Sequence, residues 1–209
     1  MPYPVAVELE QALTNRNRLT TAFRLILAIP HVILVGGIGV GVAGGRDGRT
    51  TVGSEGGLLG AVAIFLAMIS WVTIVFAGTH IPGIRQFTTF YLRWRVRAIA
   101  YLMLLEDAYP PFGEGPYPAA VEIVDPPSAR DRLSVGLRLL FALPHIFVLF
   151  FVLIAWAFTT IAAWFSILFT GNYPRGLYEF GVGALRWRLR VEAYLLLMVD
   201  EYPPFSLGD

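Results

Sequence analysis

The sequence predicts an all-α integral membrane protein made of two tandem repeats, and three observations carry this prediction. First, hydrophobic residues make up 56% of the 209-residue chain and charged residues only 15%, whereas a soluble domain carries about 25% charged residues. Second, long apolar runs without charge recur along the chain. Third, sequence from the first half returns in the second. A net charge of +1 offers no strong field to nucleic acid, and the chain has no cysteine for a thiolate metal site.

The apolar runs cover residues 25–45, 56–84 and 139–174. Crossing a hydrocarbon core of roughly 30 Å takes a helix of about 20 residues, so the first two runs fit one helix each. The third run would extend roughly 54 Å as a single helix at about 1.5 Å per residue. We therefore expect two short helices folded into a hairpin there, and the alternative is one badly mismatched helix. A hairpin of such short helices either crosses steeply or stops short of the far face.

Two constant offsets define the repeat. Residues 24–31 return as 138–145, an offset of 114, and Arg-Trp-Arg-Val-Arg at 93–97 returns as Arg-Trp-Arg-Leu-Arg at 186–190, an offset of 93. The difference, 114 minus 93, is 21 residues that only the first copy possesses, in a Gly-rich insertion at about 36–57. We assign residues 1–115 to repeat one and 116–209 to repeat two.

The insertion predicts where each hairpin turns. A polar, Gly-rich segment must lie outside the hydrocarbon, because irregular backbone exposed to lipid cannot satisfy its amides. We therefore expect the insertion at the tip of a hairpin in repeat one. The same tip in repeat two should lie near residues 150–156, which gives four membrane helices in two hairpins.

Each repeat also carries a short strand before its hairpin and an Arg-bearing helix after it. Residues 5–10 alternate at period two and predict a strand, which we expect to pair with its copy at 119–124. Residues 84–107 and 177–200 carry the Arg-Trp-Arg-x-Arg sequence and end before a Pro-Pro pair, which stops a helix. We expect each of them to form a helix at the membrane interface, partly covered by its own hairpin.

The distribution of arginine predicts the membrane topology. All 16 basic residues are Arg, and only Arg46 and Arg49 lie in the insertion. Because positive residues stay on the cytoplasmic side, we expect a multi-pass protein of the plasma membrane with both termini cytoplasmic and the insertion outside. Parallel repeats would relate the two halves by an axis along the membrane normal.

The repeated unit resembles a family of uncharacterised bacterial, mainly actinobacterial, membrane proteins called domain of unknown function 4389. The residues that carry the resemblance are Leu-Pro-His at 143–145, Trp-Phe-Ser-Ile-Leu-Phe-Thr-Gly-Asn-Tyr-Pro-Arg-Gly at 164–176, Arg-Trp-Arg-Leu-Arg-Val-Glu-Ala-Tyr at 186–194 and Asp-Glu-Tyr-Pro-Pro-Phe at 200–205. Two tandem copies cover nearly the whole chain, although repeat one has Thr-His-Ile-Pro-Gly at 79–83 in place of residues 172–176. The resemblance implies location in a bacterial cell membrane and supplies no activity.

Two histidines are candidate haem ligands. His31 and His145 each follow a proline at equivalent positions, and two neutral imidazoles that face one another can ligate a haem iron. The alternative is that each imidazole serves the carbonyl group left free by Pro30 or Pro144. We favour this structural role, so we expect no cofactor and no metal.

The Arg-Trp-Arg-x-Arg sequences are candidate sites for anionic lipid headgroups, because guanidinium groups match phosphate geometry and Trp favours the interface. The candidate residues are Arg93, Trp94, Arg95, Arg97, Arg186, Trp187, Arg188 and Arg190. The alternative is ion pairing inside the protein. It would join Arg97 or Arg190 to one of four carboxylates, Glu8, Asp107, Glu122 or Asp200.

The sequence contains no Ser-His-Asp grouping, HExxH motif or acid pair at a useful spacing, so we expect no enzyme. The function that we expect is a non-catalytic scaffold or accessory subunit of a larger membrane complex, with anionic-lipid contacts at the cytoplasmic face. Its expected partners are membrane lipids and a larger complex or further copies of itself, not nucleic acid. The alternatives are a small transporter or channel element with a pathway at the repeat interface, and a haem-bearing electron-transfer subunit that uses His31 and His145.

Overall fold

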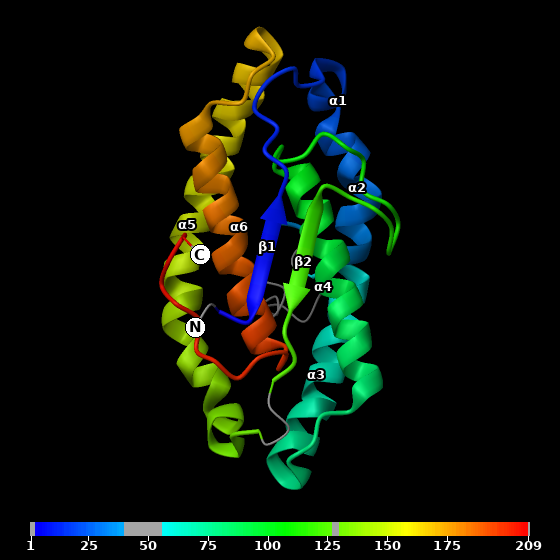
Figure 1. Cartoon of the computed structure of the whole chain (residues 1–209), viewed down its shortest axis with the longest axis vertical. Coiled ribbons are helices and arrows are strands. Elements are labelled where there is room, and N and C mark those ends of the chain that lie inside the picture. The colour runs from blue at the N-terminus through cyan, green and yellow to red at the C-terminus, as the bar shows by residue number, and fades with distance from the viewer. Residues whose placement is uncertain (1–2, 40–55, 127–129, 209) are drawn as a thin grey trace, which may run out of the picture.

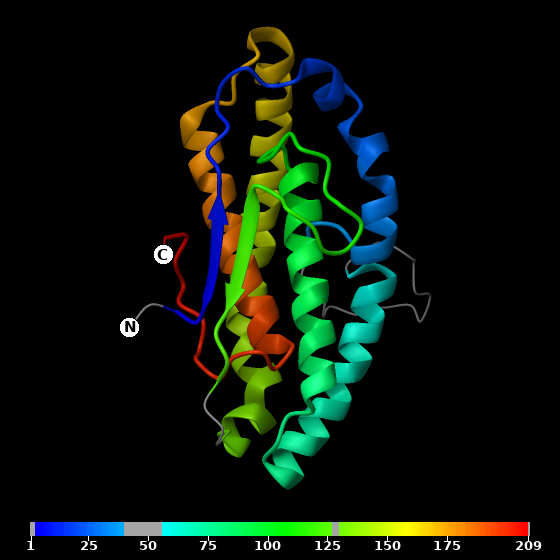
Figure 2. The same cartoon turned by 45° about the vertical axis from the view of Figure 1, so that its right-hand side comes forward.

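The computed structural model describes residues 3–39, 56–126 and 130–208, in which helices form most of the chain (Figure 1). The elements in chain order are β1 (Val5–Leu9), α1 (Arg18–Ala22), α2 (Arg24–Val35), α3 (Gly57–Ala77), α4 (Pro82–Leu102), β2 (Ala119–Ile123), α5 (Arg132–Thr170) and α6 (Arg175–Leu195). They stack in three layers. The ribbon of β1 and β2 covers α4 and α6, and these helices pack on a layer formed by α2, α3 and α5 (Figures 1 and 2).

The two predicted strands pair as an antiparallel ribbon, which confirms the expected pairing. The register places Val7 opposite Val121, and these residues are themselves related by the offset of 114. The centre of the ribbon therefore lies on a local two-fold axis. Alternation buries Val5 and Val7 and exposes Glu8 and its counterpart Glu122, so the ribbon has one apolar face and one polar face.

Helix α5 is a single helix of 39 residues, so the predicted turn near residues 150–156 is wrong. The Asp131 side chain begins the helix by accepting hydrogen bonds from the backbone amides of Leu133 and Ser134, and Gly171 ends it in the left-handed conformation at φ 76°. Pro144 lies inside the helix and removes one backbone donor without ending it. Gly136 lies near the start of the helix, and residues 137–170 contain no Gly and no Pro other than Pro144, so nothing in the long apolar run forces a turn.

In the first repeat, α1, α2 and α3 together occupy the place of α5. Helix α3 begins where α2 ends and continues in the same direction (Figure 2). A Cβ atom on Gly57 would lie 2.5 Å from the backbone nitrogen of Gly36, so the two ends of the insertion meet. The insertion therefore interrupts one line of helix, and the predicted hairpin tip in repeat one is also wrong. Residues 40–55, on which the predicted outward orientation of the insertion depends, lie outside the described residues.

The helical line formed by α2 and α3 runs antiparallel to α5. Trp71 in α3 donates a hydrogen bond from Nε1 to the carbonyl of Val135 over 3.1 Å, and Trp164 in α5 donates one to the carbonyl of Thr21 over 2.9 Å. These two contacts are related by the repeat offsets, so the end of each line meets the start of the other. The two-fold axis is therefore perpendicular to the long helices. Among the described residues, α3 and α5 are the helices long and apolar enough to cross a membrane.

The Arg-bearing helices α4 and α6 form the middle layer, and most of their residues are buried. Little of either helix is left to face lipid, because the ribbon covers one side of these helices and the long helices cover the other. Both end about five residues before the predicted positions, where Leu104 and Leu197 adopt φ 63°. These left-handed residues turn the chain and leave carbonyl groups at the helix ends.

Candidate functional site

A cluster around Asp200 joins the end of α6 to the start of α5. Its carboxylate binds Arg130 Nε at 2.6 Å and Arg138 Nη2 at 2.8 Å, and both arginine side chains are buried. Arg130 also donates to the carbonyl of Leu197 over 3.0 Å, which the left-handed turn exposes. The Arg138 guanidinium lies 4.4 Å from the ring centre of Tyr194, a cation–π contact.

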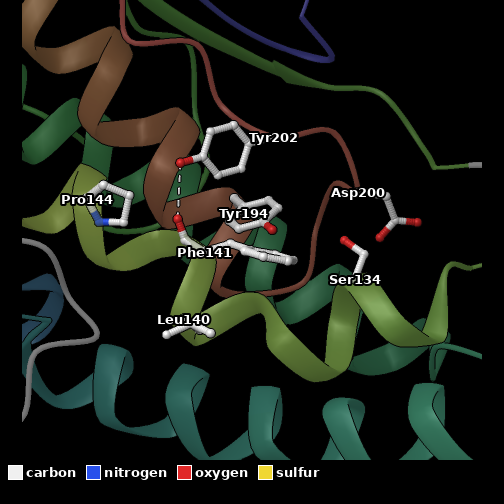
Figure 3. Close-up of a pocket in the computed structure, with 7 residues that line it drawn as sticks. All are labelled: Ser134, Leu140, Phe141, Pro144, Tyr194, Asp200 and Tyr202. Carbon is white, nitrogen blue, oxygen red and sulfur yellow. Dashed lines mark hydrogen bonds between the residues drawn. The ribbon is translucent and has the colours of Figure 1, made fainter.

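A pocket of about 390 Å³ opens beside this cluster (Figure 3). It is lined by Ser134, Leu140, Phe141, Pro144, Tyr194, Asp200 and Tyr202. The Tyr202 hydroxyl donates to the carbonyl of Phe141 over 3.1 Å. Both oxygens of Asp200 bind arginine, and the lining residues include no histidine to activate Ser134.

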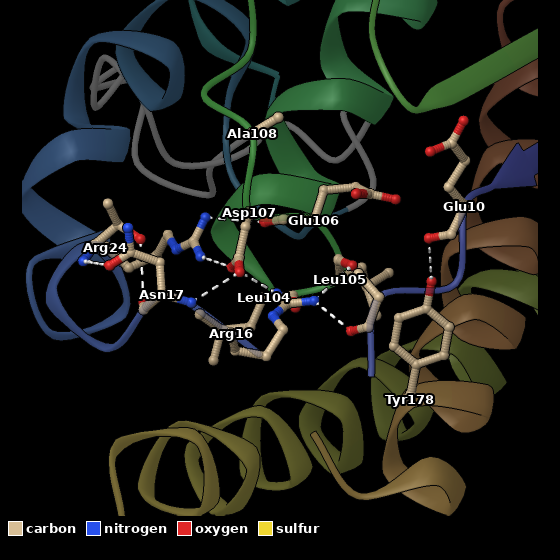
Figure 4. Close-up of polar contacts among 12 residues, drawn as sticks. Glu10, Arg16, Asn17, Arg24, Leu104, Leu105, Glu106, Asp107, Ala108 and Tyr178 are labelled. Atoms are coloured by element: carbon tan, nitrogen blue, oxygen red, sulfur yellow. Dashed lines mark hydrogen bonds and ion pairs between the residues drawn. The ribbon is translucent and has the colours of Figure 1, made fainter. Parts of the chain in front are cut away.

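An equivalent cluster surrounds Asp107 at the end of α4 (Figure 4). Arg16 Nη2 and Arg24 Nη2 lie 2.8 Å and 2.7 Å from Asp107 Oδ1, and the backbone amide of Asn17 donates to Oδ2 over 3.0 Å. Arg24 stacks 4.0 Å from the ring centre of Tyr101. Each of these groups has its counterpart in the Asp200 cluster at the offset of 114 or 93, except for the amide of Asn17.

The two clusters act as clamps between helices. Arg16 donates to the carbonyls of Leu104 and Leu105 over 2.5 Å and 3.3 Å, which satisfies backbone acceptors at the end of α4. The arrangement therefore fixes α4 and α6 to the long helices.

Glu106 is a second carboxylate beside the Asp107 cluster, and it has no counterpart in repeat two, where Val199 occupies the position. Its side chain is buried. Burial raises the pKa of Glu106 to about 7, although Arg16 nearby opposes this rise. Glu106 is thus a buried group that titrates near neutral pH.

The structure places the two candidate haem ligands in separate aromatic pockets. Trp94 Nε1 donates to His31 Nδ1 over 3.0 Å, and Trp187 Nε1 donates to His145 Nδ1 over 3.2 Å. His31 also stacks on Phe112 with ring centres 4.6 Å apart, and His145 stacks on Phe205 at 3.8 Å. Each imidazole is therefore packed within its own repeat, and the partner of its Nδ1 is a tryptophan rather than the carbonyl group left free by Pro30 or Pro144.

The structure holds the eight candidate headgroup residues against protein groups. Trp94 and Trp187 are buried beside the histidines. Arg93 and Arg186 donate to the ribbon carbonyls of Val121 and Val7, both over 3.3 Å. Arg97 donates to the carbonyl of Gly113 over 3.3 Å, and Arg190 donates to that of Gly208 over 2.8 Å. This placement favours internal contacts over headgroup binding.

The remaining pair, Arg95 and Arg188, forms a central cluster with Glu192. Arg95 Nε lies 3.0 Å from Glu192 Oε1, and Arg188 Nη2 lies 3.1 Å from Oε2. All three side chains are fully buried. Repeat one has Ile99 where repeat two has Glu192, so one carboxylate serves both arginines. These buried side chains lie where α4 of repeat one packs against α6 of repeat two.

Both central arginines also bind the segment that follows α2. Arg95 donates to the carbonyls of Val35 and Gly39, and Arg188 donates to those of Ile38 and Gly39, both over 2.8 Å. A broken helix leaves carbonyl groups without partners at its C-terminal end, where cations are favoured. The two arginines therefore stabilise the start of the insertion.

The family model for Domain of unknown function (DUF4389) matches residues 56–113 and 132–206, which is more than half of the chain. The chain belongs to this family. The two DUF4389 segments are consistent with two tandem copies and contain Asp107, Asp200 and the central cluster. No curated protein and no solved structure matches the chain.

Sequence reasoning missed the arginines that bind the two aspartates. Its ion-pair alternative offered Arg97 or Arg190 to Asp107 and Asp200 among four carboxylates, whereas the observed partners of Asp107 are Arg16 and Arg24. The repeat did contain the signal. Arg16 returns as Arg130 and Arg24 as Arg138 at the offset of 114, and an arginine retained at two equivalent positions near an apolar run needs a partner.

Proposed function

We propose that the protein is a non-catalytic scaffold or accessory subunit in the bacterial plasma membrane, with both termini on the cytoplasmic side. One observation carries this proposal: charged side chains form ion pairs inside the protein, while large apolar side chains cover its outer helices. Asp107, Asp200 and Glu192 each bind two arginines. A soluble protein keeps its charges outside, so the opposite distribution supports a lipid environment.

Anionic lipid contacts belong to this proposal at two exposed arginines. Arg18 and Arg132 are related by the offset of 114 and begin α1 and α5. Both are exposed, and each stands beside an exposed leucine, Leu19 or Leu133. A guanidinium group next to apolar surface suits a phosphate headgroup above acyl chains. These two residues take the role that the sequence predicted for the Arg-Trp-Arg-x-Arg residues.

Native mass spectrometry on the tagged protein, extracted from its own membrane in mild detergent, tests the proposal. We expect a stoichiometric polypeptide partner together with retained anionic lipid. Recovery of the protein as a monomer or homo-oligomer alone would contradict the accessory role. A bound mass of about 616 Da, the mass of haem b, would instead support electron transfer through His31 and His145.

A double variant tests the lipid contacts in the same experiment. Arg18→Gln with Arg132→Gln should reduce the retained anionic lipid, because it removes two charges at the apolar border. Arg175→Gln is the matched control, since Glu179 already neutralises this exposed arginine at 2.7 Å. Equal lipid loss in the control and the double variant would contradict the assignment.

A further inference from the structure

The outer face of α5 is apolar along its whole length. Leu133, Phe147, Phe158 and Phe169 have exposed fractions of 72%, 67%, 69% and 77%, so large apolar side chains face outward at both ends and in the middle. The single charged residue between Leu133 and Phe169, Arg138, is buried. This face extends about 54 Å at 1.5 Å per residue, whereas the hydrocarbon core is about 30 Å thick. A helix that crossed the membrane would leave much of this face in water.

The antiparallel line of α2 and α3 presents a similar face. Leu25 near its start and Phe76 near its end are 73% and 75% exposed, and between them the described residues carry no charge. Because α3 and α5 pack side by side, the two lines form one apolar layer. The layer runs along the long axis of the molecule (Figure 1).

The opposite face of the molecule is polar. The ribbon lies about halfway along the long axis (Figure 1), and its outer surface carries the exposed carboxylates Glu8 and Glu122. Each strand also has one edge that no further strand of the described chain covers. If the long axis crossed the membrane, these carboxylates and open strand edges would face lipid near the bilayer centre, where both are strongly disfavoured.

We infer that the long helices lie in the plane of the membrane, with their outer faces among the acyl chains of one leaflet and the ribbon in water. A helix of about 10–12 Å diameter fits within one leaflet. The two-fold axis through Val7 and Val121 then lies along the membrane normal, as the sequence predicted, but the protein does not cross the bilayer. Arg18 and Arg132 come to the same depth, so both reach headgroups of one leaflet.

This inference rests on the proposed membrane location, and it replaces the expected multi-pass topology. Residues related by the two-fold axis provide its test. Gly83 and Gly176 are exposed at opposite ends of the molecule, near the starts of α4 and α6. A Cβ atom at either position would meet nothing within 4 Å. In-plane helices place both glycines on one side of the membrane, whereas spanning helices place them on opposite sides.

The experiment uses single-cysteine variants, because the natural chain has no cysteine. Gly83→Cys, Gly176→Cys and Ala120→Cys on the ribbon are treated with a membrane-impermeant maleimide, in intact cells and in inverted membrane vesicles. We expect all three to react from the cytoplasmic side alone. Phe158→Cys, on the outer face of α5, should react only after detergent is added. The unmodified chain is the control without a reactive thiol.

Reaction of Gly83→Cys and Gly176→Cys from opposite sides would overturn the inference. Recovery in the soluble fraction as a dimer would also overturn it, since a second copy would then cover the apolar layer. Gln86→Cys and Glu179→Cys, a second exposed pair related by the offset of 93, guard against a local effect of either glycine substitution. The native mass spectrometry experiment does not depend on how the protein is oriented in the membrane. Failure to find a polypeptide partner would therefore contradict the scaffold proposal without contradicting the in-plane arrangement.

Discussion

At the scale of single residues, the buried charges have one recurring form, in which one carboxylate serves two arginines. Asp107, Asp200 and Glu192 each show it. Further guanidinium donors of these arginines bind backbone carbonyls that follow helix ends. Loss of one carboxylate therefore leaves two buried cations at once. Such a loss is costly, because a buried charge without its partner keeps its desolvation penalty and loses the compensating attraction.

Asp200→Asn tests this point. We expect it to lower the free energy of unfolding by roughly 3 kcal/mol, because Arg130 and Arg138 lose their counter-charge. Thermal unfolding in mild detergent measures the change. Asp125→Asn is the control, since Asp125 pairs with Arg85 at the surface and is 84% exposed, where an ion pair contributes about 0–1 kcal/mol. Equal effects of the two substitutions would refute the clamp role of Asp200.

Glu106 predicts a pH dependence of stability. Its pKa is raised from 4.5 to about 7 in the folded protein, so the folded state holds the proton more tightly than the unfolded state. The contribution of protonated Glu106 to the free energy of unfolding is fully present below pH 4.5 and is lost as the pH rises through about 7. Glu106→Val, which copies Val199 of repeat two, should remove this loss and stabilise the protein at pH 8, by roughly 3 kcal/mol at most.

Unfolding of the parent and of Glu106→Val at pH 5 and at pH 8 checks this prediction. The difference between the two proteins should grow with pH. A difference that stays constant would show that Glu106 does not titrate in this range. Val199 is itself fully buried, so the equivalent position already accommodates this side chain.

At the scale of elements, the junction of α2 and α3 depends on one glycine. Gly57 has φ +67°, and a Cβ atom there would lie 2.5–2.7 Å from backbone atoms of Leu34 and Gly36. Only glycine adopts this conformation without strain, and backbone atoms cannot move aside as a flexible side chain does. The meeting of the two ends of the insertion therefore requires glycine at this position.

Gly57→Ala should destabilise the protein by about 1–3 kcal/mol through backbone strain and the close contact. Gly83→Ala, in α4, provides the control. Its Cβ would meet nothing within 4 Å, so it should be neutral or stabilising by up to about 1 kcal/mol. The melting temperatures of the two variants, measured in the same detergent, test this difference in stability. If Gly57→Ala melts like Gly83→Ala, the junction is not constrained in this way.

At the scale of the whole molecule, the helices α2 to α6 all run close to the long axis (Figures 1 and 2). Their average direction therefore reports the orientation of the protein in a membrane. Polarised infrared spectroscopy of oriented bilayers that contain the protein measures this direction through the amide I band. We expect dichroism typical of helices parallel to the bilayer surface. Dichroism typical of helices along the normal would contradict the one-leaflet arrangement.

The sequence by itself determined the features that depend on composition and local pattern. An apolar chain with little charge predicts a membrane environment, period-two alternation predicts the strands, and constant offsets reveal the two copies and their family. The pairing of β1 with β2 followed from the same repeat, because equivalent short strands are natural partners. The strands, their pairing and the family are confirmed, because each depends on nearby residues or on direct comparison of two stretches of the chain.

Only the tertiary structure decided how the helices connect and where the arginines lie. The long run in α5 contains no turn signal, so its predicted division came from an assumed crossing of the membrane, and that assumption fails for helices that lie in its plane. Arg188 and Glu192 are neighbours one turn apart on α6, but Arg95 and the carbonyls of the segment that follows α2 meet this pair only after the two copies pack antiparallel. Long-range packing sets these contacts, and no local periodicity encodes it.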